Sequence, residues 1–188
     1  MNLEGRSLAE VAAFVCEHLR SSGFDAVVVG GSAITIHVPQ VYTSFDIDLA
    51  VTNGARRHGF QKALEEIGFH ACGRNYAHPD TVYTVDFVAE TPYIDQHAIT
   101  EFIEVQTSLG VVRTYRLEDA LADRIAAFVH WKDGESLAVA ERIVEAVPGK
   151  LTPTRLHESL AMIDASFPGA AQRVDFARKR LMEKLSEA

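Results

Sequence analysis

Three short motifs in this 188-residue chain carry residue types that could do chemistry. The first, Gly30-Gly31-Ser32, follows the apolar run of residues 26–29. The second is Asp46-Ile47-Asp48, and the third is Asp86, which stands within the mostly apolar run of residues 82–88. Glycines, a hydroxyl and carboxylates are groups that can hold a phosphate chain and a divalent metal ion.

The aspartates are candidate catalytic and metal-binding residues. In a β-strand alternate residues point to the same side, so Asp46 and Asp48 face one way while Ile47 turns into the core. Two adjacent carboxylates repel each other unless a cation such as Mg²⁺ joins them. Asp86 would be destabilising as an isolated acid on a central strand. Beside the other two, it could complete a two-metal site and act as general base on an attacking hydroxyl.

The Gly30-Gly31-Ser32 turn predicts a phosphate site. Its two glycines let the backbone approach a ligand closely. We expect Ser32 to cap a short helix ending near His37, whose first N–H groups and dipole attract anions. The Ser32 hydroxyl could also donate to a phosphate oxygen. Such turns are common where a strand leads into a helix, so the interpretation depends on the acids that follow.

Taken together, the motifs resemble the signature of the DNA polymerase β-like nucleotidyltransferases. Thirteen residues separate Gly31-Ser32 from Asp46-Ile47-Asp48, and Asp86 follows on a later strand. The resemblance covers residues 25–90 and extends more weakly through 117–146. Within the family, the chain is similar to minimal bacterial and archaeal members, including toxin–antitoxin and abortive-infection nucleotidyltransferases. It implies that the three acids, Asp46, Asp48 and Asp86, bind Mg²⁺, and that Gly30, Gly31 and Ser32 bind the triphosphate of an NTP.

A triphosphate also needs a cation from the protein. Many members of the family carry an arginine just before the Asp-x-Asp motif, but residues 40–43 here are Gln-Val-Tyr-Thr. The cation must therefore come from elsewhere, and the candidates are Arg74, Arg124 and Lys132. We assign Lys132 to nucleotide binding, with an ordinary helix-end cation as the alternative. The neighbouring Trp131 is expected in the core rather than as a platform for stacking a base.

Hydrophobic periodicity predicts the elements that position these residues. Ser7 and Glu10 form a capping box for a first helix that stops near Gly23. Further helices are expected at residues 32–37 and 55–67, strands at 26–29, 47–51, 69–72 and 82–88, a loop at 73–81, and a hairpin of 101–108 with 111–115. Only helical patterns follow, at about 117–131, 134–147, 153–166 and 169–186.

The predicted architecture is α/β (α+β), a nucleotidyltransferase fold with a small mixed sheet flanked by helices and a C-terminal helical extension. We divide it into a nucleotidyltransferase domain of residues 1–115 and a helical part of residues 116–188 packed on that domain. The division follows the change of pattern after residue 115, from alternating strands and helices to helices alone.

Charge and composition exclude several classes of function. A formal net charge of −8 and a pI of about 5.4 argue against a broad face for duplex DNA, although not against a nucleotide or an RNA end in a local pocket. The basic residues near the C-terminus are expected on a solvated helix face. No apolar stretch approaches the ~18 residues of a membrane span, and the N-terminus has no signal-peptide pattern. We expect a cytoplasmic protein.

These patterns predict a Mg²⁺-dependent nucleotidyltransferase. It would move an NMP from an NTP to an acceptor hydroxyl on a protein, an RNA end or a small molecule, with release of pyrophosphate. The alternative is a non-catalytic module of the same fold that binds a nucleotide or a partner protein, as in a toxin–antitoxin pair. The missing motif arginine supports the alternative, whereas three carboxylates argue against it because their repulsion serves nothing without a metal.

Overall fold

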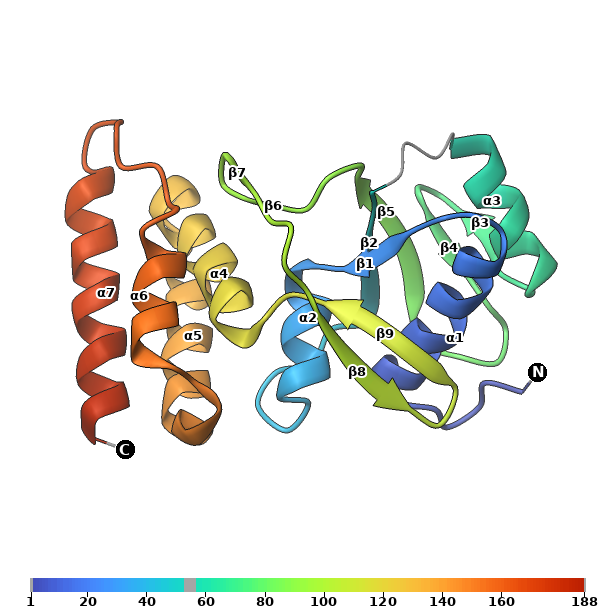
Figure 1. Cartoon of the computed structure of the whole chain (residues 1–188), viewed down its shortest axis with the longest axis horizontal. Coiled ribbons are helices and arrows are strands. Elements are labelled where there is room, and N and C mark those ends of the chain that lie inside the picture. The colour runs from blue at the N-terminus through green and yellow to red at the C-terminus, as the bar shows by residue number, and fades with distance from the viewer. Residues whose placement is uncertain (1, 53–56, 188) are drawn as a thin grey trace.

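A mixed β-sheet forms the centre of the protein in the computed structural model, which describes residues 2–52 and 57–187 (Figure 1). Its strands lie in the order β3-β4-β5-β2-β1-β9-β8, and β6 pairs with β7 in a separate hairpin. The strands are β1 (Ala26–Val28), β2 (Asp46–Val51), β3 (His70–Cys72), β4 (Asn75–Ala77), β5 (Thr84–Ala89), β6 (Tyr93–Ile94), β7 (His97–Ala98), β8 (Ile103–Thr107) and β9 (Gly110–Thr114).

Helices cover both faces of the sheet and extend beyond it toward the C-terminus (Figure 1). They are α1 (Leu8–Ser21), α2 (Gly30–His37), α3 (Arg57–Glu66), α4 (Leu117–Trp131), α5 (Gly134–Ala146), α6 (Pro153–Leu160) and α7 (Ala170–Glu187), with a 3-10 turn at Pro148–Lys150. No helix in the described ranges combines the length and the apolar character that crossing a membrane requires.

Alternation along β2 separates the core from the acids. Ile47 and Leu49 are fully buried in a hydrophobic cluster with side chains of α1 and α3. Because neighbouring strand residues point to opposite faces, Asp46 and Asp48 face the side of the sheet where α2 and α4 lie. The strand therefore uses its apolar residues for packing and presents its carboxylates to the region between the sheet and the helices.

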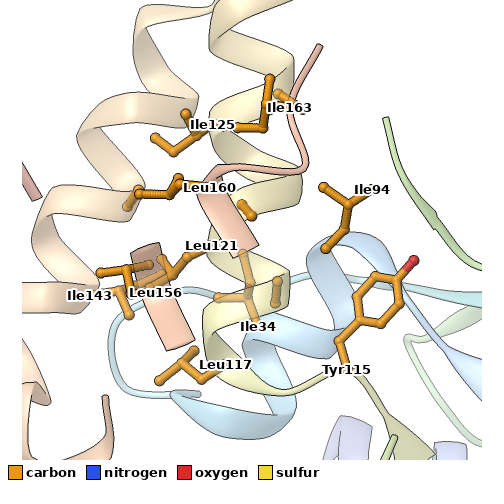
Figure 2. Close-up of a cluster of buried hydrophobic side chains, with 14 of the residues drawn as sticks. Ile34, Ile94, Tyr115, Leu117, Leu121, Ile125, Ile143, Leu156, Leu160 and Ile163 are labelled. Carbon is orange, nitrogen blue, oxygen red and sulfur yellow. The ribbon is translucent and has the colours of Figure 1, made fainter. Parts of the chain in front are cut away.

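A second hydrophobic cluster joins the sheet to the C-terminal helices. It combines Ile34 of α2 and Tyr115 with side chains of α4 to α7, among them Leu121 and Leu160 (Figure 2). Because these residues come from both sides of position 115, the helical part packs directly on the first part. The assignment of residues 1–115 and 116–188 as separate domains remains a prediction.

Most predicted elements are present. The capping box at the start of α1 is confirmed, with the backbone N–H of Ser7 donating to Glu10 and that of Glu10 donating to Ser7. Of the basic residues of α7, Lys179 and Arg180 are exposed as expected, and Arg180 pairs with Glu141 of α5 at 2.7 Å, whereas Arg173 packs inward and donates to Val129 O. The first residues of the helix predicted over 55–67 lie outside the described ranges.

Three predictions about helix and strand boundaries were wrong, and one hairpin was missed. The α2 helix begins at Gly30 with Val29 as its N-cap, so Ser32 lies in the first turn and does not cap it. Residues 73–81 include β4, and α6 ends at Leu160 rather than near residue 166. The β6–β7 hairpin was not predicted, because strands of two residues leave no periodicity to detect.

Replacing Leu121 by alanine should destabilise the protein by about 3 kcal/mol, because Leu121 is fully buried in the cluster that joins α4 to the sheet side. Urea denaturation followed by circular dichroism measures this cost. Phe176→Ala is the control, since Phe176 is 53% exposed, and it should cost less than about 1 kcal/mol. A Leu121→Ala cost no larger than that of the control would show that this packing contributes little.

Candidate active site

The three predicted aspartates come together on two adjacent strands. Strands β2 and β5 run parallel, and their register places Asp48 opposite Asp86 and Asp46 opposite Thr84. Asp46 is exposed at the beginning of β2, whereas the Asp86 side chain is only 17% exposed. Paired strand residues have neighbouring side chains, so the fold places three carboxylates on one face of the sheet.

Neighbouring polar groups hold the first of these acids. Thr84 Oγ1 donates a hydrogen bond of 2.5 Å to Asp46 Oδ1, and Asn75 Nδ2 lies 3.4 Å from the same oxygen. Sequence reasoning missed both residues. Thr84 stands two positions before Asp86 and so on the same strand face, a spacing that could have identified it. Asn75 lies on β4, in the segment predicted to be a loop.

Asp48 is the most perturbed of the acids. Burial, together with the nearby charges of Asp46, Asp86 and Asp123, raises its pKa to about 6, while Arg124 opposes the shift. A carboxylate with a raised pKa favours a cation that would share its charge. Asp48 is therefore a position where a bound cation would be stabilising.

Ser32 connects the glycine turn to the aspartate strand. Its buried hydroxyl donates to Val29 O at 2.7 Å and accepts the backbone N–H of Asp48 at 3.0 Å. The Val29 N–H in turn donates to Asp48 O at 2.9 Å. The hydroxyl thus fixes the start of α2 beside β2. What α2 offers to a phosphate in this arrangement is the N–H groups of its first turn, which have no partner within the helix.

Glycine is required at the closest approach between these two elements. Gly30 has φ of 60°, and a Cβ placed on it would lie 2.8 Å from Asp48 Oδ2. A side chain at this position would be strained and would collide with the carboxylate. The helix N-terminus and the Asp48 carboxylate can therefore act on the same ligand.

Of the three candidate cations, Arg124 of α4 lies beside the glycine turn. A Cβ on Gly31 would come within 2.9 Å of Arg124 Nη2. The guanidinium stacks on the Tyr42 ring, 4.7 Å from its centroid, and donates to the Tyr42 hydroxyl. Arg74, by contrast, lies with Nε 3.8 Å from Asp86 Oδ2 and is 86% exposed.

The other two residues noted at the end of α4 lie on its surface. Lys132 is the exposed C-cap, with a left-handed φ of 57°. Its assignment to nucleotide binding remains a prediction. The expectation that Trp131 belongs to the core was wrong, because this side chain is 80% exposed. It shares the last turn of α4 with the fully buried Val129 but lies two positions further on, on another face of the helix.

Of the three acids, Asp48 lines a pocket of about 370 Å³. Gly30, Asp48, Tyr93, Tyr115 and Asp123 contribute to its wall. Asp123 comes from α4, and burial raises the pKa of its carboxyl group to about 6 while Arg124 opposes the shift. Only the weak part of the family resemblance had pointed to this residue. Its position depends on how α4 packs on the sheet, which no local pattern reports.

Replacing Asp48 by asparagine should stabilise the metal-free protein at pH 7.5 by about 2 kcal/mol. Because the folded-state pKa of about 6 lies above the ordinary 3.8, the wild type loses stability as pH rises from about 4 through 6. The gain should therefore shrink as pH falls toward 4. Thermal denaturation in EDTA at several pH values measures it.

Asp80→Asn is the matched control for that experiment, because Asp80 is an exposed acid of a surface loop. Its melting temperature should stay within about 2 °C of the wild type at each pH. An Asp48→Asn protein that is less stable than the wild type at pH 7.5 would contradict the electrostatic account.

Comparison with known proteins gives a match in fold. No family model matches the chain, and no curated protein matches it in sequence. An antigenic nucleotidyltransferase-like protein from Paracoccidioides brasiliensis superposes with a TM-score of 0.56 and 14% identity, over 93% of this chain and 95% of that one.

Two structures of the antibiotic-resistance factor ANT(2'')-Ia match less closely, each with a TM-score of 0.42 and 18% identity. The solution structure matches over 96% of this chain and 93% of its own, and the crystal structure with adenylyl-2''-tobramycin over 90% and 94%. The Paracoccidioides protein, with its TM-score above 0.5, supports the assignment of the fold. The chain has the nucleotidyltransferase fold, an α/β architecture with a mixed sheet and C-terminal helices, as its sequence predicted.

Proposed function

We propose that the protein is a Mg²⁺-dependent nucleotidyltransferase that moves an NMP from an NTP to an acceptor hydroxyl. One observation carries the proposal: Asp48 faces Asp86 across adjacent strands, Asp46 lies on the same face, and the N-terminus of α2 begins beside Asp48. An anion site and a carboxylate cluster in contact are what a metal–triphosphate complex needs.

The residues fit magnesium in their chemistry. Asp46, Asp48 and Asp86 offer hard carboxylate oxygens, which are the ligands that Mg²⁺ takes together with substrate phosphates. In residues 2–52 and 57–187, no group of three or more His, Cys, Asp and Glu side chains is placed so that it could hold a metal ion without moving. We therefore expect the NTP phosphates to supply the remaining ligands. Bound metal would neutralise the charge that develops on the transferred phosphate.

The protein's own groups would orient the reactants. The N–H groups of Gly30, Gly31 and Ser32 would bind phosphate oxygens, with Arg124 as the nearby cation. Asp86 would accept the proton of the acceptor hydroxyl. The acceptor oxygen would then form a bond to the α-phosphorus, while the bond between the α-phosphorus and the leaving pyrophosphate breaks. Such transfer depends mainly on positioning and charge neutralisation.

A non-catalytic nucleotide- or partner-binding module remains the second candidate, and one observation favours it. Arg124 is already engaged with Tyr42 and Ser136, and the Ser32 hydroxyl is bonded to backbone. If these groups keep their present partners, the site could bind an NTP without turning it over. A partner protein, such as the other half of a toxin–antitoxin pair, would belong to this candidate.

A thermal-shift panel with each of the four NTPs, with and without Mg²⁺, tests the proposed site. An NTP at about 100 times its Kd should stabilise the wild type by about 2.7 kcal/mol, which is a rise of several degrees for a chain of this size. The rise should require Mg²⁺ and should disappear in Asp48→Asn, when each variant is compared with its own ligand-free melting temperature.

Asp80→Asn should keep the full nucleotide-dependent rise, since it removes an equal charge outside the site. Identical Mg²⁺-dependent rises in the wild type and Asp48→Asn would overturn the proposed metal site. Once an NTP is identified, release of pyrophosphate in the presence of candidate acceptors separates the transferase from the binding module.

A further inference from the structure

We propose that the pocket at the C-terminal end of α4 binds the acceptor, and that it selects a hydroxyl compound carrying a protonated amine. This inference rests on the proposed nucleotidyl transfer and names the class of its second substrate. The pocket measures about 570 Å³ and is lined by residues of α4, of the β6–β7 turn and of the segment before α7, including Asp95, Asp123, His130, Trp131 and Phe167.

Asp123 connects this acceptor pocket to the catalytic carboxylates. It lines both the 570 Å³ pocket and the 370 Å³ pocket that contains Asp48 and Gly30. A ligand in the acceptor pocket could therefore reach the reaction centre along Asp123. Together the two spaces have the size of pockets that bind small molecules.

The Asp123 carboxylate is available for such a ligand. It is largely buried, and within the described ranges it has no hydrogen-bond or ion-pair partner. A buried carboxylate without a partner is costly, and an ammonium group that donates to it would remove that cost. Asp95, in contrast, is already engaged, since it accepts from the His130 ring at 2.8 Å and from the Asp164 N–H at 2.6 Å.

Aromatic rings form the rest of the wall. The His130 ring packs on Phe167 with centroids 4.8 Å apart, and the largely exposed Trp131 stands at the pocket rim. Such rings favour an apolar ligand face or a cation near them. The wall therefore suits a small compound with an apolar skeleton and a positive charge.

The two sides of the reaction centre differ in charge. Arg124 stands beside Gly31 on the side assigned to the triphosphate. No lysine or arginine is among the described residues that line the acceptor pocket, and the nearby Arg173 is engaged with Val129 O and the Phe167 ring. An anionic acceptor such as an RNA end would meet only the His130 ring among these residues, which is already bonded to Asp95, whereas an ammonium group would find Asp123.

Trp131 makes the test direct, because it is the only tryptophan of the chain and its fluorescence reports on this pocket. The probe is 1,3-diamino-2-propanol at pH 7, a hydroxyl flanked by two amines. Glycerol is its neutral counterpart. We expect a saturable change with the diamine that weakens with added salt, and none with glycerol at equal concentrations. Asp123→Asn should weaken diamine binding at least about tenfold, and Asp80→Asn should leave it unchanged.

Equal responses to the diamine and glycerol, or equal diamine affinity in Asp123→Asn and the wild type, would overturn the proposal. So would displacement of the diamine by an NTP with Mg²⁺, because the pocket would then hold the nucleobase. The fluorescence change needs no nucleotide, so its failure is distinguishable from failure of the NTP thermal shift, which tests the proposed transfer.

Discussion

Repulsion among the carboxylates of β2 and β5 is the constraint on which the site depends. The parallel register fixes Asp48 against Asp86, and burial, together with the neighbouring charges, raises the pKa of Asp48 to about 6. A fold that keeps such charges together gives up stability unless a ligand brings positive charge. The rest of the structure can be understood as the means of holding that arrangement in place.

Two packing arrangements do this work. Ile47 and Leu49 bury one face of β2 against α1 and α3, which turns the carboxylates toward α2 and α4. Ser32 then joins α2 to β2 by hydrogen bonds, which hold the helix N-terminus beside Asp48. The hydrophobic cluster that packs α4 on the sheet places Asp123 in the wall of the 370 Å³ pocket that also contains Asp48 and Gly30.

The sequence was sufficient for features that depend on local spacing. Alternation placed Asp46 and Asp48 on one face, and the order of motifs indicated the fold. It was insufficient where tertiary packing determines which side chains become neighbours. Thr84 and Asn75 reach Asp46 only because β5 pairs with β2 and β4 pairs with β5. The expectation for Trp131 rested on its apolar side chain, although the buried stripe of α4 that contains Leu121, Ile125 and Val129 leaves position 131 on another face. Three further groups, the Ser32 hydroxyl, Arg124 and Asp123, likewise acquire their surroundings from residues distant in the chain.

The central claim is that the carboxylates on β2 and β5 bind a divalent metal together with an NTP. Crystals grown with Mn²⁺ and a non-hydrolysable NTP analogue test it directly, because manganese takes oxygen ligands and scatters anomalously. We predict an anomalous peak that places Mn²⁺ in contact with Asp46, Asp48 and a phosphate of the nucleotide. A bound nucleotide with no peak at these carboxylates, or with manganese held elsewhere, would contradict the account.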